Sequence, residues 1–318
     1  MKTEMPETLH EAIAYFSTGK NALNTMIAKR WPAGVICSHC GTKNVRFMEA
    51  RSAWQCRDCR KQFTVKTGTI FEDSPITLDK WLVALWLITG AKNGISSCEL
   101  GRSIGVTQKT AWFMLHRIRM ALKNGTIEKL SGDVEVDESW IGGRARNMHA
   151  AVKREKIHGT GNKALTPVQG LLQRTTAKGA SKVHLRVVDG TKRPELQGNV
   201  RKYVLAGATV HTDALKSYTG LAEDFTHHVV DHAVEYVRGN VHTNGMENFW
   251  SLLKRTVKGT YVSIEPFHLH RYLDEQAFRF NERKNSDGDL GRFETGLAGV
   301  FGKRLTWNRL TGADGELK

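Results

Sequence analysis

The stretch DVEVDESWIGG, residues 133–143, determines how the second half of the chain is interpreted. Its valines alternate with Glu135, Asp137 and Ser139, and the run ends at two glycines. Alternation of this kind, closed by a turn, is typical of a β-strand. Because neighbouring side chains of a strand point to opposite faces, the three polar residues share the face that the valines do not use. The pattern therefore predicts a sheet with a carboxylate, Asp137, on one face.

A second candidate carboxylate ends the segment GATVHTDALKSY, residues 207–218, which reads as a short strand running into Asp213. Glu135 and Glu138 are the alternatives to Asp137 as the first acid, and Asp231 is the alternative to Asp213. Further strands are expected within residues 165–174, 181–190 and 224–232, and a helix within 194–205.

A third acid lies in HTNGMENFWSLLKRTVKG, residues 242–259, whose periodicity predicts an amphipathic helix. At roughly 100° per residue, the polar face and the apolar face separate cleanly. The polar face carries Asn244, Glu247, Ser251, Lys254 and Lys258. The apolar face carries Met246, Phe249, Trp250, Leu253 and Val257. Amphipathicity alone would make Glu247 a solvent-facing charge.

The order of these elements favours a different role for Glu247. A strand with an inward acid, further strands, a helix, a strand ending in an acid and a helix with an acid form the layout of a ribonuclease-H-like domain with a mixed sheet. Two strand carboxylates and one helix carboxylate converge in that layout. Three acids suit two hard divalent ions, about 4 Å apart, which need to be neutralised and bridged during phosphoryl transfer.

The first quarter of the chain contains CSHCGTKNVRFMEARSAWQCRDC, two C-x2-C pairs separated by fifteen residues. Each pair can turn both sulfurs toward one ion, and two pairs complete a closed tetrahedral site. The four predicted ligands of one structural zinc ion are Cys37, Cys40, Cys56 and Cys59. Short strands between turn residues suit a zinc ribbon. Disulfides and a redox dithiol are the alternatives.

Residues 96–122, SSCELGRSIGVTQKTAWFMLHRIRMAL, have the spacing of a helix-turn-helix, with Gly105 in the turn and Thr107 capping the second helix. A plain helical hairpin is the alternative. The side chains left over for a DNA groove and its phosphates are Gln108, Lys109, Thr110, His116, Arg117 and Arg119.

The composition points to a polyanionic partner. Lys and Arg number 47 against 32 Asp and Glu among 318 residues, a formal net charge of +15. Nucleic acid is the commonest partner of such a chain, although a merely basic protein is the alternative. Residues 144–163 hold six Lys or Arg and one acid, so a basic loop containing Arg144 and Arg146 is expected either in solvent or along DNA.

Other features of the sequence concern the compartment. No apolar run reaches the roughly 18 residues that span a bilayer, and the N-terminus lacks the apolar core of a secretory signal. The five cysteines are an odd number, which favours reduced thiols. We therefore expect a cytoplasmic protein without a membrane partner.

Taken together, these residues resemble those of the bacterial insertion-sequence transposases that join an N-terminal zinc ribbon to an Asp-Asp-Glu catalytic core. The similarity extends along nearly the whole chain. It is carried by RWPAGVICSHCG, WQCRDCRKQFTVKTGTIFEDS, LGRSIGVTQKTAWFMLHRIR, VEVDESWIGG, HTDALKSY, VHTNGMENFWSLLKRTVKGTY and LHRYLDEQAFRFNER.

The resemblance implies roles for individual residues. Asp137 and Asp213 would be the first two ligands of a pair of Mg²⁺ or Mn²⁺ ions, and Glu247 the third. Lys254 would contact DNA near the reacting phosphate. Apart from the resemblance, Arg255 and Lys258 in the same segment are further candidate DNA contacts. Some relatives use an asparagine as the third ligand, at the place of Asn244. Charge favours Glu247, because an amide oxygen neutralises nothing.

The expected function is a DNA transposase that binds the terminal inverted repeats of an insertion sequence, nicks the DNA and transfers strands. Double-stranded DNA and a homodimer or larger assembly are its expected partners. The alternatives are a ribonuclease-H-like nuclease and a DNA-binding regulator with an inactive core. The expected parts are a helical lead-in (1–30), the zinc ribbon (31–73), the helix-turn-helix (74–125), the catalytic domain (130–285) and a loosely packed tail (286–318).

Overall fold

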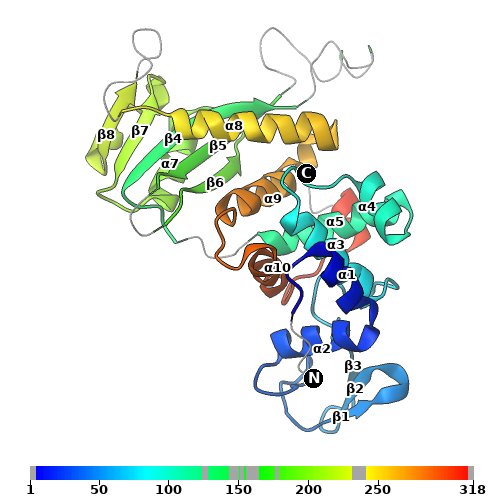
Figure 1. Cartoon of the computed structure of the whole chain (residues 1–318). Helices are drawn as coiled ribbons and strands as arrows, with labels where there is room; N and C mark the ends of the chain where they lie inside the picture. Colours follow the sequence, from blue (N-terminus) through cyan, green and yellow to red (C-terminus); the bar gives the residue numbers. More distant parts are fainter. Residues whose placement is uncertain are drawn as a thin grey trace. The chain divides into compact units, whose positions relative to one another are not determined.

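The chain forms two compact units (Figure 1). The computed structural model describes residues 5–123, 128–142, 150, 154, 165–175, 179–230 and 241–313. The first unit comprises residues 1–124 and 285–318, and the second comprises residues 125–284. The five-part division expected from the sequence is finer than this and stays a prediction. Arg144, Arg146 and Asp231 lie outside the described residues.

The first unit begins with helices and a small sheet. Its elements are α1 (Leu9–Ser17), α2 (Gly19–Arg30), β1 (Val45–Met48), β2 (Ala53–Cys56), β3 (Gln62–Phe63), α3 (Leu78–Gly90), α4 (Ser97–Ile104), α5 (Gln108–Leu122), α10 (Gly288–Ala298) and α11 (Trp307–Thr311). The sheet is antiparallel in the order β1-β2-β3. It is held by aromatic packing: Trp54 stacks on Phe63 with 5.9 Å between ring centroids, and Trp31 meets Trp54 edge-on at 5.3 Å. No helix in the described parts of the chain is long and apolar enough to cross a membrane.

Helices α4 and α5 form the expected helix-turn-helix. The Ser96 hydroxyl accepts from the Glu99 N–H at 3.1 Å and begins α4, and Gly105 ends it with φ 64°, a left-handed conformation that costs glycine little. Thr107 then begins α5 by accepting from the Thr110 N–H at 3.2 Å. These local signals explain why this pair of helices was predictable residue by residue.

The C-terminal residues belong to the core of the first unit, which corrects the expectation of a loosely packed tail. Phe293 on α10 is fully buried, with its ring 5.5 Å from Phe16 and 5.1 Å from Trp86. Farther on, the Lys303 ammonium donates to the carbonyls of Met120 and Lys123 at 3.1 and 2.8 Å, at the end of α5. Cations are favourable there because the last carbonyls of a helix carry partial negative charge.

The second unit is built on one mixed sheet. Its elements are β4 (Asp133–Ile141), β5 (Thr166–Gln173), β6 (Lys182–Val187), α7 (Arg193–Tyr203), β7 (Thr209–Asp213), β8 (Thr226–Val230), α8 (Asn244–Thr256) and α9 (Leu269–Asn281). The five strands lie in the order β6-β5-β4-β7-β8. Strands β4, β5 and β6 pair antiparallel, whereas β4-β7 and β7-β8 pair parallel. The predicted fold class, a multidomain α+β chain with a zinc ribbon and a ribonuclease-H-like mixed-sheet domain, is confirmed.

Each face of this sheet has its own core, with α7 on one side and α8 and α9 on the other (Figure 1). Val134 and Val136 are fully buried in the cluster that includes α7. Ile141 and Leu172 belong to the cluster that includes α8 and α9. Because alternate residues of β4 face opposite sides, Asp137 lies on the α8 side of the sheet.

Helix α8 lies close to the sheet because Gly170 on β5 has no side chain. A Cβ built there would meet the Met246 Cε at 2.3 Å and the Trp250 Cζ2 at 2.8 Å. Gly170 is the partner of Asp137 across the β4–β5 pairing. The glycine therefore brings the first turns of α8 directly over the strand that carries Asp137.

We predict that Gly170→Ala destabilises the second unit by about 1–3 kcal/mol, the usual cost of overpacking a filled core. Gly198→Ala is the matched control, because Gly198 is exposed on α7 and a Cβ there meets nothing within 4 Å. That change should stabilise by about 0.5–1 kcal/mol, since alanine is the better helix former. Urea unfolding of both variants measures the two effects. Equal stabilities for the two variants would contradict the close approach.

Candidate metal centres and DNA-binding surface

Three predicted acids come from three separate elements of the second unit. Asp137 lies in the middle of β4, Asp213 is the last residue of β7, and Glu247 lies in the first turn of α8. Strands β4 and β7 run parallel with Val136 opposite Thr212, so the next residue of each strand, an aspartate in both cases, faces α8 side by side. The strands and the helix that carry these residues are the expected ones, and the role of the three acids as metal ligands stays a prediction.

The pKa of Asp137 is affected by the charges of the other two acids. Burial raises the pKa of Asp137 to about 6, even though its carboxylate accepts hydrogen bonds from the Glu138 N–H and the Trp250 indole. The charges of Asp213 and Glu247 raise it further. Repulsion among neighbouring carboxylates is relieved by a bound cation, and carboxylate oxygens are the ligands that Mg²⁺ and Mn²⁺ prefer. The donor types suit a divalent ion, but within the described residues the four cysteines are the one group of three or more such ligands whose atoms lie within 4.8 Å of one another, so a metal site at the three acids stays a prediction.

The indole of Trp250 holds Asp137 in place. Its Nε1 donates to Asp137 Oδ2 at 3.0 Å, and the Trp250 side chain is only 4% exposed. Trp250 follows Glu247 by three residues, so one turn of α8 supplies both a carboxylate and the donor that orients its neighbour. The sequence placed Trp250 on the apolar face of the helix and gave no sign of this contact.

The two rivals of Asp137 have other partners. Glu135 is buried, accepts from Arg174 Nε at 2.7 Å and accepts from the Met246 N–H at 2.8 Å, so it caps the start of α8 from the strand. Glu138 points to the opposite face, where the Tyr218 hydroxyl donates to it. Burial raises the pKa of Glu138 to about 9, with the charges of Asp137 and Asp213 adding to the effect.

The exposed face of α8 continues away from Glu247 as a basic surface. Asn244 and Glu247 are exposed in its first turn. Lys254, Arg255 and Lys258 follow, all exposed. Within the described parts of the chain, none of these three cations makes an ion pair or side-chain hydrogen bond. They are therefore available to an anionic partner.

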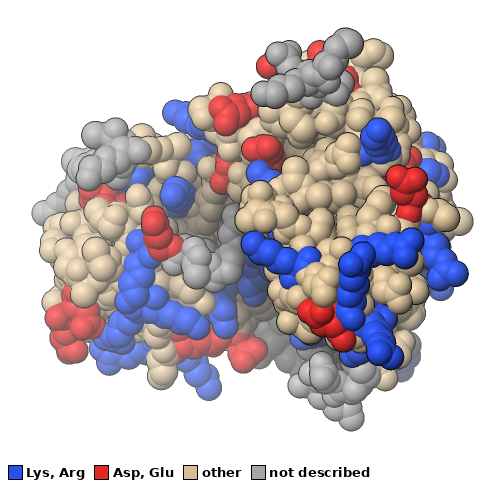
Figure 2. Space-filling view, turned by 90° about the horizontal axis from the view of Figure 1, so that it is seen from below, with Lys and Arg blue, Asp and Glu red and all other residues tan. Residues whose placement is uncertain are grey.

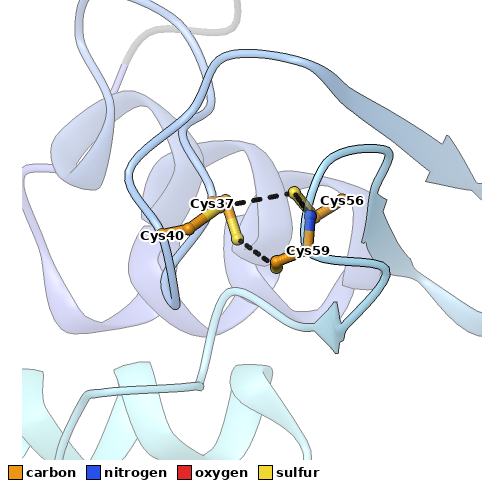
Figure 3. A group of neighbouring side chains, drawn as sticks. All are labelled: Cys37, Cys40, Cys56 and Cys59. Atoms are coloured by element: carbon orange, nitrogen blue, oxygen red, sulfur yellow. Dashed lines mark hydrogen bonds between the residues drawn. The ribbon is translucent and has the colours of Figure 1, made fainter.

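The four cysteines converge in the first unit (Figure 3). Their sulfurs all lie within 4.8 Å of one another, with Cys37 3.7 Å from Cys59 and Cys40 3.6 Å from Cys56. The His39 N–H points to the Cys37 sulfur at 3.4 Å, which favours the thiolate form. Four thiolates at this spacing fit a closed tetrahedral zinc site with no position left for chemistry.

Three of the predicted DNA contacts of the helix-turn-helix lie in the first turn of α5. Gln108 is exposed and donates to Ser97 Oγ at 2.8 Å. Lys109 is exposed with its ammonium 4.7 Å from the ring centroid of Trp307. Thr110 is half-buried, 2.9 Å from the Thr107 hydroxyl. Gln108 and Lys109 can reach a partner with a change of rotamer.

Arg117 corrects the sequence-based prediction. It is 6% exposed, and its guanidinium donates to the carbonyls of Leu305 at 3.1 Å and Glu72 at 2.9 Å. His116 and Arg119 are also buried. These side chains belong to the core of the first unit and are not free for a DNA groove. The C-terminal segment that covers them lies almost two hundred residues away in sequence.

Lys and Arg side chains are not spread evenly over the surface. Figure 2 shows them gathered in dense patches on the face it draws, with acids in smaller groups between them. Such patches raise the local potential and attract polyanions more strongly than the same charges dispersed.

Comparison with known proteins identifies the two domains that contain these residues. Residues 17–62 match the model of a transposase zinc-ribbon domain, and residues 129–281 match that of an ISXO2-like transposase domain. The chain is also similar to a protein in the transposable element ISH50 of Halobacterium salinarum. The two are 31% identical over 262 residues, which cover 76% of this chain and 84% of the relative. The matched ranges contain all four cysteines and all three predicted acids.

The raised pKa of Asp137 predicts how stability depends on pH. A carboxyl group whose pKa rises from 3.8 to about 6 on folding contributes stability below pH 4 that is lost as the pH rises through 6, at most about 3 kcal/mol. We expect Asp137→Asn to remove this part of the decline in metal-free protein. Added Mg²⁺ should raise the melting temperature of the wild type more at pH 8 than at pH 5. An equal gain in Asp137→Asn would contradict the site.

The indole contact predicts a loss of metal affinity without loss of the fold. Trp250→Phe keeps a ring against Gly170 but removes the donor to Asp137, and we expect Mn²⁺ to bind about 10–100-fold more weakly, the usual effect of losing a residue that orients a ligand. Calorimetric titration measures it. Trp140→Phe is the control, because Trp140 lies on the same strand as Asp137 with its side chain 38% exposed. Equal affinities in both variants would refute the orienting role.

Proposed function

Because the chain belongs to the insertion-sequence transposases that join a zinc ribbon to an ISXO2-like transposase domain, we propose that it nicks DNA at the ends of its element and joins them to target DNA. The proposal is supported by the buried Asp137, whose pKa is raised by the charges of Asp213 on another strand and Glu247 on a helix, beside an exposed basic surface.

The first unit would recognise the terminal inverted repeats. Its zinc ribbon and helix-turn-helix are two separate modules, and Gln108 and Lys109 stand exposed at the start of the second helix of the pair. Side chains in that position read base edges or fix the register on phosphates. The net charge of +15 supports binding of flanking and target DNA by the remaining basic surface.

The second unit would carry the chemistry. Asp137, Asp213 and Glu247 would hold two divalent ions, Mg²⁺ or Mn²⁺. When bound, such ions activate a water or a 3′-hydroxyl as the nucleophile and stabilise the leaving oxygen. Trp250 keeps the Asp137 carboxylate oriented toward α8. The carboxylates bring negative charge, so cations on α8 are needed to hold a DNA phosphate nearby.

Lys254 would bind that phosphate, seven residues beyond Glu247 on the same helix. Arg255 and Lys258 would follow the DNA backbone along the helix. Asn244 lies one turn before Glu247 and would assist as a neutral ligand or a phosphate contact. It is also the alternative to Glu247 as third ligand, which the experiment below decides.

Joining two element ends requires two protomers, so a homodimer or larger assembly on DNA follows from the reaction. Acting on chromosomal DNA would place the protein in the cytoplasm, at the nucleoid. A nuclease that cuts without strand transfer and a regulator that binds without cutting are the competing functions, and they differ in the products they leave.

We expect the full chain, given labelled duplexes from the flanks of its own gene, to release nicked and joined products in Mg²⁺ or Mn²⁺ but not in EDTA. Asp137→Ala and Glu247→Ala should lower the joined product at least about 1,000-fold, since each removes charge that the transition state needs. Asn244→Ala should weaken it. Glu223→Ala, which removes an exposed glutamate of the same unit, is the control and should be fully active.

Each competing function has its own outcome. Nicks without joined products would indicate a nuclease, and binding without any cutting in either metal would indicate a regulator. Activity that survives Glu247→Ala but is lost in Asn244→Ala would assign the third ligand to the asparagine.

A further inference from the structure

Helix α8 ends in an unusual turn. After Thr256 the chain continues as a π-helical turn, Val257–Tyr261, and Val262 follows with φ 62° and ψ −54°. The Val262 N–H donates to the Val257 carbonyl at 2.8 Å, and the next N–H donates to the Tyr261 carbonyl at 2.6 Å. A β-branched residue rarely adopts positive φ, so the backbone at Val262 is strained.

Buried contacts hold this turn in place. The Tyr261 hydroxyl donates to Glu275 on α9, which is fully buried and paired with Arg279. The Tyr261 ring lies 4.8 Å from that of Tyr272, also on α9. A strained conformation persists where its surroundings determine it, and these contacts supply that determination. The residue before Val262 is therefore fixed to α9.

The fold gains no packing from Val262 itself. Its side chain is 78% exposed, the largest exposed fraction among the large hydrophobic residues that the structure describes, and Phe267 nearby is 40% exposed. Glycine or asparagine would satisfy the backbone there with less strain. A valine held rigidly in solvent at a strained turn indicates a contact outside the described chain.

The position of Val262 indicates which contact. Glu247, Ser251 and Lys254 recur at spacings of three and four residues, so they line one exposed face of α8, and Lys258 lies exposed in the π-helical turn that continues the helix. Val262 follows this turn directly. With a rise of 1.5 Å per residue as far as Thr256 and the more compact π-helical turn beyond it, Val262 lies roughly 20 Å from Glu247 along the helix. Duplex DNA advances 3.4 Å per base pair, so this distance corresponds to about six base pairs.

We propose that Val262 is an apolar wedge that inserts against a base step of duplex DNA about six base pairs from the phosphate that is cut. The proposal rests on the transposase function above and adds a contact with the bases. The cations Lys254, Arg255 and Lys258 hold the backbone of a duplex lying along α8, and the exposed valine beyond the end of the helix meets the groove. Proteins that kink DNA use apolar side chains in this way, and unstacking needs a support that does not yield.

DNA is favoured over a protein partner by the charges around the wedge. Glu265 is exposed three residues after Val262, but the three cations outnumber it, and they have no ion pair within the described residues. A protein surface that docked on Val262 would need acids to match them. A phosphate backbone supplies matching charge on both sides of a groove.

The test places 2-aminopurine, one position at a time, four to eight base pairs on either side of the cut in a duplex from the gene's own flank. The full chain is added in EDTA, and fluorescence reports unstacking. We expect a several-fold rise at one step about six base pairs from the cut. Val262→Gly should abolish the rise while keeping an equal or higher melting temperature, and Val262→Ile should retain it. Leu205→Ala, a change at a residue 52% exposed in the same unit, is the control and should behave as wild type.

Cutting of the flank in Mg²⁺ separates the two proposals. If the wild type cuts but the fluorescence rises at no step, or if it rises equally with Val262→Gly, the wedge is refuted and the transposase function stands. If Val262→Gly changes the oligomeric state and leaves the fluorescence unaltered, the turn at Val262 joins copies of the chain and the wedge is refuted. If the wild type neither cuts nor binds the flank, both proposals fall.

Discussion

The contact between α8 and the sheet at Gly170 is the constraint on which the candidate active site depends. A side chain there would collide with Met246 and Trp250 and lift the helix away from β4. Lifting α8 would separate Glu247 from Asp137 and break the indole hydrogen bond that orients the aspartate. The missing side chain at Gly170 thus sets how closely α8, and Glu247 with it, approaches Asp137.

A buried charge network fixes the start of the same helix. Glu135 accepts from the backbone of α8 and from Arg174, whose guanidinium also donates to the His242 carbonyl at 2.6 Å. Removing one partner of such a network leaves an uncompensated buried charge, which is costly. The strand that supplies Asp137 therefore also anchors the helix that supplies Glu247. Gly170 determines how closely α8 packs on the sheet, and Glu135 determines where α8 begins.

The parts of the fold that could be predicted from sequence are those determined locally. The alternation around Asp137 predicted on which face of β4 its side chain lies, and the cysteine spacing predicted the four-cysteine cluster. The capping residues Ser96 and Thr107 predicted where two helices begin. The parts that were missed depend on contacts distant in sequence. Helical periodicity could not show that Arg117 is covered by residues near Leu305. Nor could it show that the indole of Trp250, on the apolar face of α8, donates a hydrogen bond to the Asp137 carboxylate.

The first unit is discontinuous, because residues 125–284 interrupt it and α10 and Lys303 return to complete its core. During synthesis at about 5–20 residues per second, the ribosome needs roughly 10–35 s to pass from residue 124 to residue 303. For that time the N-terminal helices lack Phe293 and the cap on α5. The inserted unit is contiguous and is made entirely within this interval. A nascent chain can therefore fold the unit that holds its ISXO2-like transposase domain before the core of the first unit is complete.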